Sequence, residues 1–143
     1  MYHHIMVPLD GSPLAEQALP HALALARAFD AALELVAVVP PGVVEGGPEY
    51  AVYLDRDSEV HEDEAYLQAM QSQVAADGLQ AHIRVRRGDV AAELLHHAEE
   101  ARADLIVMST HGRSGLGRWV YGSIADRVLR HAPVPVLLVR ATE

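Results

Sequence analysis

The chain alternates short apolar segments with longer segments of helical periodicity, and this alternation is the strongest constraint on its fold. The apolar segments that we predict to be β-strands cover residues 5–9, 33–39, 82–86, 105–108 and 134–139. Helical patterns separate them at residues 13–29, 58–76, 89–101 and 123–131. Connections of this kind make the strands parallel, with right-handed crossovers and helices on both faces. The sequence therefore predicts an α/β fold with a single doubly wound, five-stranded parallel sheet.

Pro20 is a local conflict within the first predicted helix, which begins at Pro13 after a Ser12 N-cap. Proline has no amide hydrogen and removes one helical hydrogen bond, so we expect a kink in the first half of this helix. The segment of residues 40–57 is a second irregularity, because it is rich in glycine, proline and acidic residues. A connection of this length is either functional or mobile, which makes it a candidate lid.

Composition narrows the classes of function. A chain of 143 residues has the size of one ordinary domain, so we expect residues 1–143 to form one unit. The formal net charge of −9 argues against general binding to nucleic acid or to an anionic membrane. No apolar run approaches the roughly 20 residues that span a bilayer. The absence of cysteine excludes disulfides and thiolate catalysis and, with an N-terminus that lacks a signal-peptide pattern, predicts a cytoplasmic protein.

A glycine-rich turn follows the strand predicted at residues 105–108 and leads into the helix that begins at Ser123. Glycines let the backbone approach an anion, and the free N–H groups of the next helix supply positive potential, so this is a phosphate-binding architecture. The chain has no lysine, which excludes a P-loop. Val120 stands where a dinucleotide-binding motif starting at Gly115 needs its third glycine. The spacing that fits is Gly112, nine residues, and then Gly122-Ser123.

This spacing resembles the nucleotide-binding branch of the universal stress protein family, in which G-x-x-G-x(9)-G-[S/T] follows the fourth strand. The match begins after Met108, and its one departure is Ser109, which stands in place of the first glycine. The resemblance covers the whole chain. Further family-like sequences are Val-Pro-Leu-Asp-Gly-Ser at residues 7–12, Gly-Asp at residues 88–89 and Val-Pro-Val-Leu-Leu-Val at residues 134–139.

The resemblance implies the strand order 3-2-1-4-5, which periodicity alone leaves open. In that order the first and fourth strands are neighbours whose connections diverge, and ligands bind in the crevice at their carboxyl ends. The implied ligand is ATP, or AMP or ADP, with any Mg²⁺ held through the bound phosphates and no protein metal site. The resemblance also implies a homodimer formed through the edge strand from Val134 to Val139, and a regulatory role with a protein partner that the sequence does not identify.

The predicted nucleotide-binding residues lie at strand ends and across the glycine-rich turn. By the resemblance, Val38 meets the adenine through its backbone, and Pro8 and Leu9 line the pocket. His111 and Arg113 are candidate phosphate contacts. The full set is Pro8, Leu9, Asp10, Val38, Gly88, Met108, Ser109, His111, Gly112, Arg113, Gly115, Gly122, Ser123 and Ile124.

Two members of this set have two interpretations each. Asp10 can accept hydrogen bonds from a ribose, or it can stabilise its own turn with Gly11 and Ser12 as an Asx interaction. The side chain of Ser109 can crowd the ligand, or its hydroxyl can bind the ligand through a hydrogen bond.

No catalytic residue is predicted, because the chain lacks a thiol, a G-x-S-x-G elbow and an identifiable carboxylate pair. His96 and His97 are adjacent, and helical neighbours point about 100 degrees apart, so they do not share a metal ion. We therefore expect an adenine-nucleotide-binding regulator. One alternative is a nucleotide-free dimeric interaction module, in which the turn is structural and Ser123 and Asp126 form a capping box. The other is slow ATP hydrolysis or phosphotransfer in the same pocket.

Overall fold

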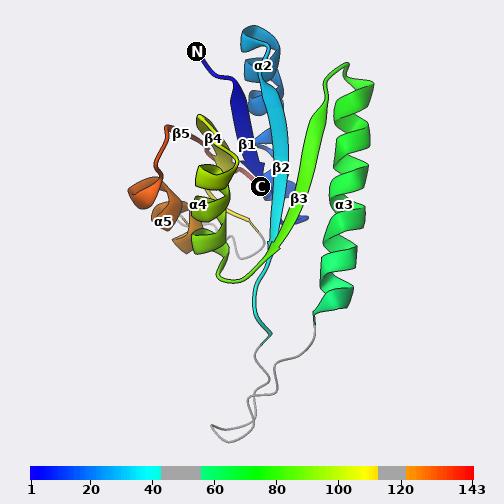
Figure 1. Cartoon of the computed structure of the whole chain (residues 1–143), viewed down its shortest axis with the longest axis vertical. Helices are drawn as coiled ribbons and strands as arrows, with labels where there is room; N and C mark the ends of the chain where they lie inside the picture. Colours follow the sequence, from blue (N-terminus) through cyan, green and yellow to red (C-terminus); the bar gives the residue numbers. More distant parts are fainter. Residues whose placement is uncertain (43–55, 113–121) are drawn as a thin grey trace, which may run out of the picture.

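The computed structural model describes residues 1–42, 56–112 and 122–143. All five strands form one parallel sheet in the order β3-β2-β1-β4-β5, which confirms the predicted fold class and strand order (Figure 1). In chain order the elements are β1 (His4–Pro8), α1 (Pro13–Glu16), α2 (Leu19–Phe29), β2 (Ala32–Val39), α3 (Asp57–Ala76), β3 (Ala81–Arg87), α4 (Val90–Glu100), β4 (Leu105–Ser109), α5 (Ser123–His131) and β5 (Val136–Val139).

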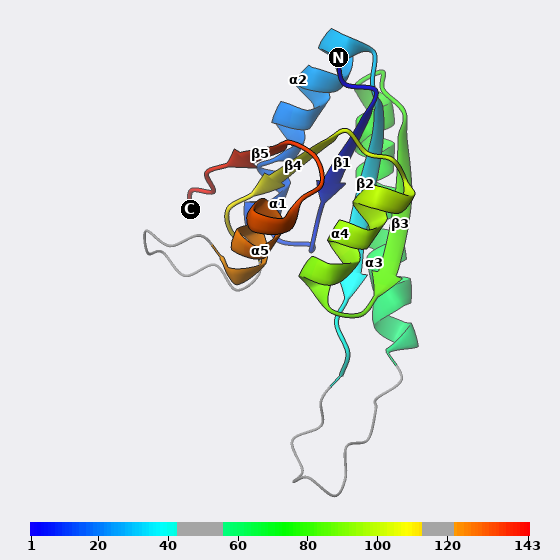
Figure 2. The same cartoon turned by 60° about the vertical axis from the view of Figure 1, so that its left-hand side comes forward.

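Helices cover both faces of the sheet (Figure 2). Successive strand residues point to opposite faces, so Ile5 and Val7 pack in one core cluster with α1, α2 and α3, whereas Met6 packs in a second cluster with α4 and α5. All three side chains are fully buried. The continuous apolar runs of the central strands follow from this double coverage. Within the described ranges, no helix combines the length and apolarity needed to cross a bilayer.

The helix predicted at residues 13–29 is two helices. α1 ends at Glu16 and α2 begins at Leu19, so Pro20 lies in the first turn of α2, where its missing N–H breaks no helical hydrogen bond. The Ser12 N-cap is confirmed, because its Oγ accepts from the Ala15 N–H at 3.2 Å. The expected kink is therefore a break before the proline. The last strand also differs from its prediction, since β5 starts only at Val136.

Glu34 is a buried charged residue in the middle of the sheet, with 7% of its surface exposed. His4 Nε2 lies 2.8 Å from Glu34 Oε2, and His97 Nε2 lies 2.7 Å from Glu34 Oε1. Arg86 NH1 lies 3.2 Å from His97 Nδ1, and because a guanidinium only donates, Nδ1 accepts and Nε2 carries the proton. The hydrogen bond from His97, assisted by that from His4, lowers the pKa of Glu34 to about 2 despite the opposing effect of burial. The network joins β1, β2, β3 and α4.

The lowered pKa of Glu34 predicts a loss of stability in acid. The pKa is about 2 in the folded protein and 4.5 ordinarily, so the contribution of this carboxylate is complete above about pH 4.5 and disappears as the pH falls to about 2. We expect the parent to lose on the order of 3 kcal/mol more than Glu34→Gln over this window. Denaturant unfolding curves between pH 6 and pH 2 measure the difference.

The matched control is Glu99→Gln, because Glu99 is exposed on α4. The control should keep the pH dependence of the parent. If the parent and Glu34→Gln lose stability with the same slope below pH 4.5, the assigned role of the Glu34 carboxylate is wrong.

Candidate functional site

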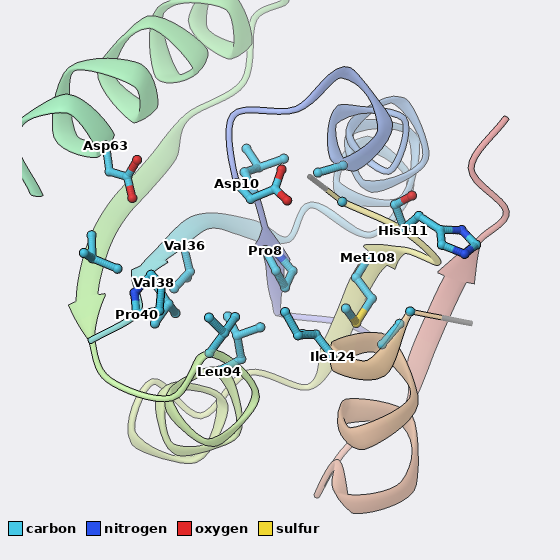
Figure 3. Close-up of a pocket in the computed structure, with 18 of the residues that line it drawn as sticks. Pro8, Asp10, Val36, Val38, Pro40, Asp63, Leu94, Met108, His111 and Ile124 are labelled. Carbon is cyan, nitrogen blue, oxygen red and sulfur yellow. The ribbon is translucent and has the colours of Figure 1, made fainter. Parts of the chain in front are cut away.

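A cavity of about 360 Å³ lies at the carboxyl ends of β1, β2 and β4 (Figure 3). β1 and β4 are neighbours in the sheet, yet the connection after β1 leads to α1 on one face and the connection after β4 leads to α5 on the other. Such a divergence leaves a crevice above the two strand ends. The cavity therefore occupies the place where sheets of this kind bind ligands.

The cavity brings together every described member of the predicted site except Gly88. The lining members are Pro8, Leu9, Asp10, Val38, Met108, Ser109, His111, Gly112, Gly122, Ser123 and Ile124. Gly88 directly follows β3, its N–H donates to the Val39 carbonyl at 3.0 Å, and it is absent from the described lining. Arg113 and Gly115 lie outside the described residues.

One side of the cavity is apolar, and the sequence predicted only some of the residues that form it. Val36 and Val38 from β2 face Leu94 from α4, with Met108 and Ile124 beside them (Figure 3). Pro40 and Val90 extend this surface. The spacing of Val90 and Leu94 marks an inward face of α4, but the sequence cannot separate a core position from a cavity wall. The surface is suited to a flat, largely apolar group.

The opposite side is acidic and comes from the first turns of α3, which the sequence did not indicate. Arg56 precedes the helix and pairs with Glu59 at 2.8 Å. The described lining contains one guanidinium and four carboxylates, which are those of Asp10, Glu59, Glu62 and Asp63. Side-chain charge on the described walls thus disfavours a polyanion, and among the described groups the backbone N–H groups are the ones suited to hold an anion.

The N-terminus of α5 supplies such backbone groups. Gly122 is the N-cap and no side chain of the described residues caps the helix, so the capping box that belonged to the alternative interpretation is not formed. Ser123 is the first helical residue, and Asp126 pairs with Arg130 at 3.0 Å. The first N–H groups of a helix have no helical partner and carry the positive end of the dipole. Because the first turn of α5 lines the cavity, this positive end opens onto it.

Asp10 and Gly112 form the contact between the two turns that flank the crevice. Asp10 Oδ1 accepts from the Ser12 N–H at 2.9 Å and from the Ser12 hydroxyl at 2.6 Å, so the Asx turn is present. Asp10 Oδ2 lies against Gly112, where a Cβ would overlap it. The absence of a side chain at Gly112 therefore lets the Asp10 carboxylate fit between the turns.

The hydroxyl groups at the end of β4 differ in their bonding. Ser109 is 6% exposed, and its Oγ is the buried side-chain polar atom without a hydrogen-bond partner in the described part of the chain. Thr110 Oγ1 lies 3.0 Å from His111 Nδ1 and accepts from the Ala141 N–H at 3.0 Å. Within the described ranges, no group of three or more histidine, aspartate or glutamate side chains is arranged to hold a metal ion.

Comparison with known proteins assigns the family. A model of the universal stress protein family matches residues 1–140. The chain belongs to this family. A universal stress protein of Methanocaldococcus jannaschii is 35% identical to it over 98% of this chain and 83% of the relative. Universal stress protein UspA from Lactobacillus plantarum has a TM-score of 0.83 at 26% identity, covering 97% of this chain and 98% of that one.

Three structures of the family with this fold contain adenine nucleotides. A universal stress protein in complex with cAMP has a TM-score of 0.72 at 24% identity, covering 99% of this chain and 98% of that one. A universal stress protein from Archaeoglobus fulgidus in complex with dAMP has the same TM-score and identity, covering 96% of this chain and 97% of that one. A family protein from Arabidopsis thaliana with AMP bound has a TM-score of 0.67 and 16% identity over 98% of this chain and 92% of its own. At 24% identity or less, the similarity of these three structures to this chain shows that the fold is shared.

The contact between Asp10 and Gly112 predicts that removing the Asp10 carboxylate lowers the stability cost of adding a side chain at residue 112. Gly112→Ala should destabilise the protein by about 1–3 kcal/mol, because the new methyl group displaces a carboxylate that Ser12 holds in place. Removing that carboxylate first, in Asp10→Ala, should reduce the cost of Gly112→Ala by at least half. Denaturant unfolding of the parent, both single variants and the double variant gives the coupling. Equal costs of Gly112→Ala in the two backgrounds would contradict the proposed steric role.

Proposed function

We propose that this universal stress protein is a cytoplasmic regulator that binds an adenine nucleotide in the cavity above β1, β2 and β4. The observation that carries the proposal is the N-terminus of α5, which no described side chain caps and which opens onto a largely apolar cavity. A volume of about 360 Å³ falls within the ordinary range for small-molecule sites. The complexes of family proteins with cAMP, dAMP and AMP add support from the same fold.

The lining suggests the orientation of the ligand. The adenine ring would pack against the apolar surface of Val36, Val38 and Leu94. The phosphate nearest the sugar would accept hydrogen bonds from the first N–H groups of α5, near Gly122 and Ser123. The sugar then lies between these groups, close to the strand ends of β1 and β4.

The charge of the described walls bears on the number of phosphates. Four carboxylates and one guanidinium line the described part of the cavity, so each additional phosphate meets more repulsion. We expect AMP to bind without metal, and ATP to bind better with Mg²⁺, which is held through the phosphates and neutralises part of their charge. A nucleotide-free interaction module and slow ATP hydrolysis are the competing functions. Turnover measurements with purified protein separate the latter from binding alone.

The phosphate position predicts the effect of Gly122→Val. A Cβ at Gly122 would lie 3.1 Å from the Thr110 carbonyl oxygen, which a small shift relieves, but the branched side chain would enter the space where the phosphate approaches α5. We expect a folded protein that binds AMP and ATP–Mg²⁺ roughly 100-fold more weakly, which is about 2.7 kcal/mol. Titration calorimetry and heating scans with and without nucleotide measure this.

The control is Ala28→Val on the exposed surface of α2, which makes a similar change away from the cavity and should bind like the parent. A parent protein that is not stabilised by any adenine nucleotide contradicts the proposed function. A Gly122→Val protein that binds as tightly as the parent contradicts only the phosphate position.

We also propose that the protein is a homodimer whose two copies meet at β5. This strand is an edge of the sheet, and Leu137 on it is 37% exposed. An apolar edge strand favours association with another chain unless it is covered, and a two-fold axis covers both copies at once. Val136 and Leu138 pack against the core beneath α4 and α5, so Leu137 is the side chain that is best placed to reach a partner.

The dimer proposal predicts that Leu137→Glu produces monomers, because two like charges would be brought together and desolvated at the shared edge. Sedimentation at micromolar concentration should change from dimer to monomer. The matched control is Ala24→Glu, which adds the same charge on exposed α2 and should leave the dimer intact. Sedimentation of the parent as a monomer would rule out the dimer.

A further inference from the structure

The hydroxyl of Ser109 is an unsatisfied polar group in a buried position. Ser109 is 6% exposed, it ends β4 and it lines the cavity. Its Oγ has no hydrogen-bond partner among the residues that the structure describes. Leaving a buried hydroxyl unpaired costs stability, since the group has lost its water and gained nothing in return. The described protein atoms supply no partner that offsets this cost, whereas a bound ligand could supply one.

Two neighbouring hydroxyl groups, those of Ser12 and Thr110, are hydrogen-bonded within the protein. Ser12 Oγ donates to Asp10 at 2.6 Å and accepts from the Ala15 N–H at 3.2 Å. Thr110 Oγ1 accepts from the Ala141 N–H at 3.0 Å and pairs with His111. The buried hydroxyl of Ser109 differs from these two, because it has no partner among the described residues.

The face of the sheet on which Ser109 lies limits what its hydroxyl can bind. Side chains alternate along β4, so Ser109 shares the face of Leu105 and Val107, which pack with α1, α2 and α3. Met108 points to the other face, where α5 lies. Ser109 is thus on the side of the Asp10 turn, away from the helix end that would hold a phosphate. The acidic wall of α3 is on the same side as Asp10 (Figure 3).

We propose that the Ser109 hydroxyl is a specificity group that hydrogen-bonds a sugar hydroxyl of the bound nucleotide. The inference rests on the proposed nucleotide function and deepens it. A sugar hydroxyl is neutral and both donates and accepts, so it matches an unpaired serine hydroxyl and tolerates carboxylates nearby. A phosphate at the same place would meet the charge of Asp10. The site is therefore built for a ribonucleotide whose sugar lies between Asp10 and Ser109.

The test is a thermodynamic binding cycle in which one hydroxyl is removed from the protein, one from the ligand, and then both together. Binding of AMP, 2′-deoxy-AMP and 3′-deoxy-AMP is measured by titration calorimetry for the parent and for Ser109→Ala. We expect Ser109→Ala to bind AMP about tenfold more weakly than the parent, which corresponds to one lost hydrogen bond. For the deoxynucleotide that lacks the bonded hydroxyl, the two proteins should bind equally, while the other deoxynucleotide should behave like AMP.

A second measurement separates binding from folding. Without ligand, Ser109→Ala should melt at the same temperature as the parent or higher, because it removes an unsatisfied group. A merely structural serine would melt lower when replaced. Ser72→Ala is the control, because the Ser72 hydroxyl is exposed on α3 and donates to the Gln68 carbonyl at 3.1 Å. It should leave AMP binding unchanged.

Each outcome bears on one claim. If the parent binds no adenine nucleotide, the proposed function fails and the inference fails with it. If the parent binds AMP and Ser109→Ala binds it equally well or more tightly, the function stands and the ligand role of Ser109 is overturned. Tighter binding by both Ser109→Ala and Ser109→Gly would show that the side chain crowds the ligand. An equal loss for all three nucleotides would overturn the assignment to the sugar.

Discussion

The parallel pairing of β1 with β4 is the constraint on which the rest of the molecule depends. Ile5 lies beside Leu105 and Met6 beside Ile106, although about one hundred residues separate the strands in sequence. This pairing places two turns at one edge of the sheet, and their chains then leave toward opposite faces. The cavity and its contact between Asp10 and Gly112 exist because of that divergence.

Electrostatics divide the cavity into regions with different preferences. The helix end at α5 provides positive potential without a charged side chain, and its field acts only over the first turn. The carboxylates of α3 provide negative potential on the opposite side (Figure 3). An elongated ligand with a single anionic end and a neutral remainder satisfies both regions at once. Such a division would let a protein with a net charge of −9 hold the proposed anionic ligand at one end of the cavity.

Two buried polar residues illustrate how structural and functional demands differ. Glu34 is bonded to His4 of β1 and to His97 of α4, and His97 is bonded in turn to Arg86 of β3. Its burial is therefore compensated within the protein, and the network fixes α4 against the sheet. Ser109 is equally buried and has no such compensation in the described residues. The first pattern belongs to the scaffold. The second, in a residue that lines the cavity, is the observation from which we infer a ligand contact.

The sequence by itself determined the elements and most of the strand-end positions of the site. Apolar runs and helical spacing are local properties, so the alternation of strands and helices could be read directly, and the family-like spacing of Gly112 and Gly122 located the turn that adjoins the cavity. The split at Pro20 was missed because periodicity continues across it, while the chain places the proline at a new helix start.

Only the tertiary structure decided which side chains share the cavity. The acidic wall of α3 depends on how that helix is rotated against the sheet, and packing sets that rotation. Gly88 precedes a helix as a binding turn would, yet the position of β3 keeps it out of the described lining. Whether the Ser109 hydroxyl has a partner depends on atoms brought together from β1, α1 and β4. Hydrogen-bond satisfaction is a property of three-dimensional neighbours, and no spacing along the chain encodes it.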